Sequence, residues 1–185
     1  MIAALAVLLA SSGAAAAASF ALSEAQKREA LRAGQRSVTV ESFDTEWRVA
    51  NGSGESVTVI TPFHRLAIAA RHAAFRNEPL KPDEPEKLLR EQGDRVLFWV
   101  SLQGPREDFA RFLTPRILVE DHEIEPAFVQ NERTALREES GTFLARCVYG
   151  FATRDLSGSS RVVLVVRDAD GRDVRRFTID LATMR

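Results

Sequence analysis

The strongest constraint on the fold is a succession of short apolar segments that fills the second half of the chain. Turn residues such as Gly104-Pro105 separate the segments, which are residues 95–102, 115–121, 124–130, 142–153, 161–168 and 175–181. Short strands at regular spacing, with turn residues between them, are typical of antiparallel β-sandwiches. We therefore predict a mainly β chain with added helices, built as an immunoglobulin-like sandwich, although the Cys–Trp–Cys pattern of true immunoglobulin domains is absent.

Two of these segments predict how the strands are placed. Residues 95–102, RVLFWVSL, are apolar on both faces, which is typical of a central strand that is buried on both sides. In residues 142–153 successive side chains point to opposite faces. One face is expected to carry Phe143, Ala145, Cys147, Tyr149 and Phe151, and the other Leu144, Arg146, Val148 and Gly150.

The first half of the chain contains a change from strand to helix at residues 56–77. Thr61 is suited to cap the first helical turn, and Pro62 fits the first helical position because the N–H it lacks would have no partner there. We predict a central helix over residues 62–76. The alternation of Leu66, Ile68 and Ala70 also fits a strand, but β-branched residues are too scarce to favour that alternative.

Other patterns in this half predict smaller elements. A helix is expected over residues 23–33, with Ser23 and Gln26 as a capping box and Gly34 as its end. Alternation at residues 38–40, 47–49 and 57–59, with a turn at 51–54, predicts a hairpin. Three prolines exclude regular structure from Pro79 until Glu86, where a short helix is expected to begin and to end at Gly93.

Residues 1–18 resemble a signal peptide, with an apolar run from Ile2 to Ala10 and small residues at 16–18 as the cleavage site. No Lys or Arg stands between Met1 and the apolar run, and an uncleaved membrane anchor is the alternative. We predict a periplasmic or secreted protein that meets a membrane only through an uncleaved signal or weak surface contact. Residues 19–93 form a mixed α/β segment and residues 94–185 the sandwich, together as one domain.

Composition excludes several classes of partner and cofactor. The 185 residues are 45% hydrophobic and 28% charged, with a net charge of −1, so no strong field favours nucleic acid. Cys147 is the single cysteine, which leaves no disulfide framework within the chain and no cysteine metal cluster. We predict no cofactor.

Three groups of residues suggest chemistry, but each has a simpler interpretation. Residues 168–173 resemble a calcium loop, yet the twelfth position would be Ile179 instead of a glutamate, so a tight turn is expected. The acidic residues 120–125 around His122 fit an exposed turn better than a proton-transfer or metal site. His64 and His72 are eight residues apart and do not form the i, i+4 pair of a helical zinc site, so both are expected to be surface imidazoles.

The outer face of the central helix is the predicted site of function. Basic and apolar side chains occur there without a carboxylate, beside His64, and the predicted interaction face is Arg65, Ile68, Arg71, His72, Phe75 and Arg76. The alternative is that the acidic segment 79–92 folds back and covers this face. We predict a non-catalytic binding or interaction module with a cell-envelope protein as partner; the alternative is a secreted or periplasmic hydrolase with a site built from loops.

Overall fold

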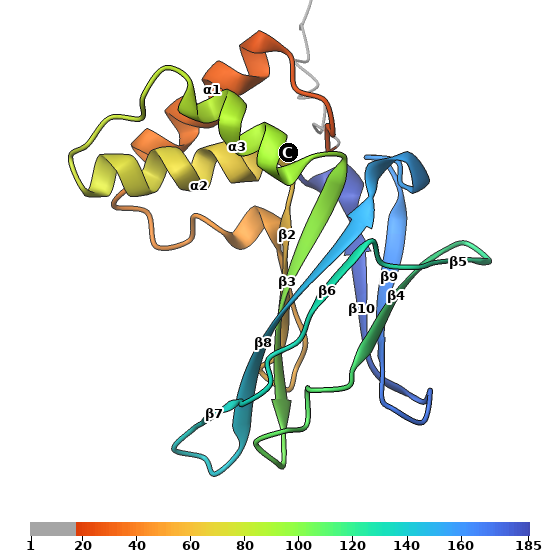
Figure 1. The fold of residues 1–185 in the computed structure, drawn as a ribbon. Coiled ribbons are helices and arrows are strands. Elements are labelled where there is room, and N and C mark those ends of the chain that lie inside the picture. The colour runs from red at the N-terminus through yellow and green to blue at the C-terminus, as the bar shows by residue number, and fades with distance from the viewer. Residues whose placement is uncertain (1–17) are drawn as a thin grey trace, which may run out of the picture.

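The computed structural model describes residues 18–185, which contain three α-helices and ten β-strands. Figure 1 shows a β-rich body with the three helices gathered at one end. The predicted signal peptide lies outside the described residues except for Ala18, whose backbone N–H donates to the carbonyl of Leu181 over 3.1 Å.

The strands form two antiparallel sheets, as predicted. The larger sheet has the order β1-β2-β3-β8-β6, with β7 also paired to β8, and the smaller sheet has the order β10-β9-β4-β5. The larger sheet contains β1 (Arg48–Ala50), β2 (Ser56–Ile60), β3 (Arg95–Gly104), β6 (Phe128–Gln130), β7 (Leu136–Arg137) and β8 (Phe143–Ala152). The smaller sheet contains β4 (Thr114–Val119), β5 (His122–Ile124), β9 (Arg161–Arg167) and β10 (Asp173–Asp180). The specifically immunoglobulin-like assignment stays a prediction.

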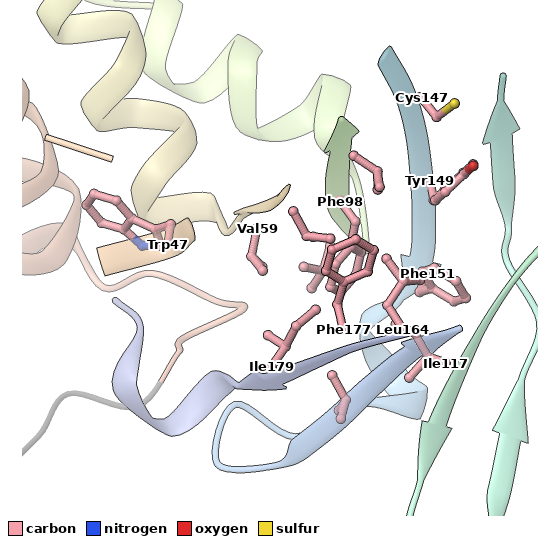
Figure 2. Packing of buried hydrophobic residues seen from close by; sticks show 14 of the residues in the cluster. Trp47, Val59, Phe98, Ile117, Cys147, Tyr149, Phe151, Leu164, Phe177 and Ile179 are labelled. Carbon is pink, nitrogen blue, oxygen red and sulfur yellow. The ribbon is translucent and has the colours of Figure 1, made fainter. Parts of the chain in front are cut away.

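The core lies between the two sheets. Alternate side chains of β3 and β8 point into it, and Phe98 meets Phe151 edge to face with ring centroids 5.6 Å apart. Leu164 of β9 and Phe177 of β10 pack from the smaller sheet (Figure 2). The buried face of β8 is the one that the sequence assigns to Phe143, Ala145, Cys147, Tyr149 and Phe151.

The helices are α1 (Glu24–Arg36), α2 (Pro62–Phe75) and α3 (Glu84–Gln92). The central helix is confirmed: the Thr61 side chain accepts from the backbone N–H of His64, and Pro62 occupies the first turn. The predicted capping box of Ser23 and Gln26 also forms. Helix α2 packs against both α1 and α3, so the three helices form one layer beside the two sheets.

Several local predictions were wrong. Helix α1 continues through Gly34 to Arg36, since that glycine serves close packing: a Cβ there would overlap the carbonyl oxygen of Ala67 in α2. Residues 38 and 39 form a turn and Val40 has no regular structure, so the strand predicted at 38–40 is absent. Helix α3 begins at Glu84, so Pro85 stands in its first turn. Strand β3 is central but is buried on one side only, as described next.

Candidate binding face

The outward face of the larger sheet carries a row of exposed and half-exposed apolar side chains. Trp99 in the middle of β3 is 40% exposed, and Leu136 of β7 is 66% exposed. Residues 95–102 therefore have one buried face and one open face, and the helices lie at the end of the larger sheet where β2 ends and β3 begins (Figure 1). We call this open face of the larger sheet the sheet face. Its apolar residues are Leu97, Trp99, Phe128, Leu136, Leu144 and Val148.

The strand register places Trp99 at the centre of this face. It stands opposite Thr58 of β2 on one side and Val148 of β8 on the other. In the adjacent row Leu97 and Phe128 flank Gly150, where a Cβ would come within 3.1 Å of Leu97 and 3.2 Å of Phe128. The missing side chain of Gly150 thus lets the apolar residues on either side close into one continuous surface.

The charged strand residues of the sheet face are all basic. Among the strand residues that point outward from the larger sheet, the charged ones are Arg48, Arg95 and Arg146. The Arg48 guanidinium donates to the Ser56 hydroxyl over 3.1 Å, and Arg95 lies 5.9 Å from the centre of the Phe128 ring. Within the described residues, none of these three guanidinium groups forms an ion pair within 4.0 Å.

The outer face of the smaller sheet provides an internal comparison. Its outward charges include both signs and most of them are paired: Arg167 bonds both Glu123 and Asp173, at 2.5 and 2.9 Å. Arg116 pairs with Glu125 and Arg176 with Asp173 in the same way. One sheet therefore presents a neutralised polar surface, whereas the other presents an aromatic and apolar surface with unpaired cations.

The structure distributes the predicted helix face over several environments. Arg71 is engaged within the chain, since it donates to the carbonyl of Val40 over 3.1 Å and lies 4.7 Å from the Phe43 ring. Arg65 and Ile68 are half-buried, and His72, Phe75 and Arg76 are exposed, with Phe75 at 78%. Segment 37–44 thus occupies part of this face, which leaves its exposed end near residues 72–76. Partner binding at this face stays a prediction.

Helix α3 partly covers the same region, as the alternative interpretation anticipated. A hollow of about 290 Å³ lies between α2 and α3. Glu84 and Glu91 of α3 line it together with His72 and Arg76 of α2. Carboxylates therefore face the basic end of α2 in the folded chain.

The histidine next to the predicted face is part of the core. The ring of His64 is fully buried and stacks on Trp47, with centroids 4.1 Å apart and planes 7° apart. Its Nδ1 lies 3.0 Å from the carbonyl oxygen of Val59, and its Nε2 lies 3.3 Å from Asp44 Oδ1. Burial lowers the pKa of His64, while the contacts with Val59 and Asp44 oppose that shift.

The remaining sequence candidates take the simpler interpretations. Asp168 accepts hydrogen bonds from the backbone N–H groups of Asp170 and Arg172, as expected for a tight turn. His122 is exposed at the start of β5, beside the β4–β5 turn. Cys147 is buried mid-strand, and burial raises the pKa of its thiol, which disfavours the nucleophilic thiolate.

The part of the chain that the structure describes contains neither a membrane-spanning helix nor a metal-binding cluster. Residues 18–185 contain no helix that is both long and apolar enough to cross a membrane. In the same range, no group of three or more His, Cys, Asp or Glu side chains is placed to hold a metal ion.

Comparison with known proteins indicates no function for the chain. No protein-family model and no curated protein matches the chain. The chain is similar to a solved structure from Burkholderia pseudomallei K96243 described as a novel protein of unknown function, with a TM-score of 0.45 and 8% identity. The similarity covers 88% of this chain and 91% of that one, and at this score it carries no argument about function.

The sheet face was missed at the sequence level, although one indication was available. Residues on the two sides of β3 differ: the inward set is Val96, Phe98, Val100 and Leu102, while the outward set, Leu97, Trp99, Ser101 and Gln103, becomes polar toward the end of the strand. A strand buried on both sides would be expected to stay apolar on both.

Proposed function

We propose that this chain is a non-catalytic binding module that holds a partner on the sheet face. The observation that carries the proposal is the exposed Trp99 at the centre of a continuous apolar surface. Tryptophan and arginine are the side chains that most often dominate binding energy at interfaces. Contiguous exposed apolar surface on a folded protein typically marks an interaction site.

The chemistry of the other candidate groups supports binding over catalysis. His64 and Asp44 come together, but the ring is fully buried and both of its nitrogens are engaged. His122, the histidine that the sequence places among carboxylates, is on an exposed hairpin whose Glu123 and Glu125 bond arginines. These residues act in folding, and a loop-built hydrolase gains no support from them.

Export is part of the proposal and rests on sequence. The apolar run of residues 2–10 and the alanines at 14–18 support a cleaved signal and a periplasmic or secreted location. A partner in the cell envelope is the corresponding proposal.

Selection from a random peptide library displayed on phage tests the binding proposal. Peptides are enriched on the wild-type chain and then tested on Trp99→Ser, with Phe75→Ser as a control because it removes a more exposed aromatic residue outside the sheet face. We expect peptides whose binding weakens about tenfold or more in Trp99→Ser and is unchanged in Phe75→Ser. They should be recovered intact, by mass spectrometry, after incubation.

Two results would contradict the proposal. Peptides that bind Trp99→Ser as well as the wild type would place the binding surface elsewhere, and cleavage of the bound peptide would indicate an enzyme. Matching circular dichroism spectra and melting temperatures of the three proteins establish that the variants are folded.

A further inference from the structure

The three arginines of the sheet face surround Trp99 at distances that suit a short polypeptide. Arg48 is two strands away in the same row, which corresponds to about 10 Å between backbones. Arg95 is four residues along the same strand, about 13 Å away, and Arg146 stands opposite Ser101 in the next row. A segment of five or six residues in extended form spans this area.

Arg48 and Arg95 are oriented by neutral contacts and keep their charge available. The Arg48 side chain is bonded to a hydroxyl, and the Arg95 Nε–H donates to the carbonyl of Gln92 over 3.3 Å. Carboxylates come close only at the β7 edge, where Glu132 accepts from the backbone N–H of Arg146 and Glu138 accepts from Gln103. Oriented arginines favour partner carboxylates because little side-chain freedom is lost on binding.

We propose that the partner on the sheet face is an acidic polypeptide segment with apolar side chains, which seats an apolar residue on Trp99 and carboxylates on Arg48, Arg95 and Arg146. This inference rests on the proposed function. Charge complementarity supports it, since the outward charged strand residues of this sheet are all basic, whereas those of the smaller sheet include Glu123 and Asp173, which bond arginines.

Other occupants of the sheet face fit less well. A second copy, packed with the same face, would bring arginines against arginines. A flat bilayer would meet the helices first: Ile60 points outward from the larger sheet but is fully buried, α3 bonds its carbonyl through Gln92, and Figure 1 shows the helices projecting from this end. A narrow segment can lie along the sheet below them.

The test uses the peptides whose binding depends on Trp99. Their affinities are measured by fluorescence anisotropy at about 50 and 300 mM NaCl, on the wild type and on the double variant Arg48→Glu/Arg146→Glu. The control double variant Arg36→Glu/Arg76→Glu changes the net charge equally on the exposed helical layer. The same measurement on vesicles of phosphatidylglycerol and on oligothymidylate covers the other anionic partners.

We expect peptides with a net negative charge, binding that weakens about tenfold at the higher salt concentration, and a further loss of about tenfold or more in the sheet-face double variant only. Neutral or basic Trp99-dependent peptides would overturn the inference and leave the binding function standing. Trp99-dependent binding of vesicles or oligothymidylate that is tighter than the binding of the peptides would also overturn it. Absence of any Trp99-dependent peptide would instead contradict the proposed function.

Discussion

His64 shows how a single residue in this chain can resemble a functional group and act in folding. Its buried ring lies between the carbonyl of Val59 and the carboxylate of Asp44 and stacks on Trp47. A carbonyl oxygen only accepts, so Nδ1 carries a hydrogen. The ring thereby ties segment 44–47 to the start of α2, and a histidine that sequence reasoning placed at the surface becomes part of the core.

The lowered pKa of His64 predicts a loss of stability in acid. Because the folded ring resists a proton that the unfolded ring accepts near pH 6.5, the free energy of unfolding should fall as the pH drops below about 6.5. His64→Gln should flatten this part of the pH profile, and His72→Gln, at an exposed position, should not. Asp44→Asn should deepen the fall, since it removes the carboxylate that supports the proton.

Urea unfolding at several pH values between 5 and 7.5 checks this prediction in all four proteins. If the free energy of unfolding changes equally with pH in the wild type and in His64→Gln, His64 is not the origin of the acid sensitivity.

Gly34 is a second residue whose role depends on its surroundings, because it lies against Ala67 of α2. In an open helix, glycine to alanine stabilises by about 1 kcal/mol. Here a Cβ would overlap the Ala67 carbonyl oxygen, so Gly34→Ala should lower the free energy of unfolding by about 1–3 kcal/mol. Gly52→Ala, where a Cβ meets no atom within 4 Å, is the control and should be close to neutral. Chemical denaturation measures both, and a stabilised Gly34→Ala would show that α1 and α2 separate readily.

At the scale of elements, an ion pair between a buried carboxylate and a half-exposed arginine ties the two sheets together. Glu55, in the turn before β2, is 1% exposed and bonds Arg175 of β10, the backbone N–H of Gln103 and the Asn51 amide. Although burial raises its pKa, these hydrogen bonds outweigh that effect and keep the pKa of Glu55 below the ordinary value. Its stabilising contribution is therefore present at neutral pH and lost as the pH falls through the lowered pKa.

Removing one member of this pair should cost more than removing both. Glu55→Leu removes the partner of the half-exposed Arg175 and of the Gln103 N–H and should lower the free energy of unfolding by about 2 kcal/mol, whereas Glu55→Leu/Arg175→Met should cost less. Equilibrium unfolding of the wild type, Glu55→Leu, Arg175→Met and the double variant at pH 7 gives the coupling energy. Additive losses would show that the two side chains act independently.

Elements were predicted more accurately than their surroundings. The caps at Ser23 and Thr61, the alternation in residues 143–151 and the turn after Asp168 follow local rules, and each is confirmed. Whether Trp99 is covered, whether Gly34 ends a helix and where His64 points depend on tertiary packing. The candidate site belongs to that second group, because the polar Ser101 and Gln103 indicate only that one end of the outward side of β3 is open, and not that Trp99 is uncovered too.

At the scale of the whole molecule, the two sheets and the helical layer have distinct roles. The smaller sheet presents paired charges, and the helices close one end of the larger sheet, so that its sheet face is the apolar and cationic surface left open. Two surfaces thus compete as the binding site: this one and the exposed end of α2 near Phe75, which the sequence suggested.

Chemical-shift mapping distinguishes these surfaces most directly. A Trp99-dependent peptide is titrated into isotope-labelled protein, and the backbone amide and Trp99 indole resonances are followed by NMR. The account predicts that the largest shifts fall on β3, β8 and β6, with the Trp99 indole among them, while residues 72–76 stay unchanged. Shifts concentrated at residues 72–76 and α3, with the sheet face unaffected, would contradict it.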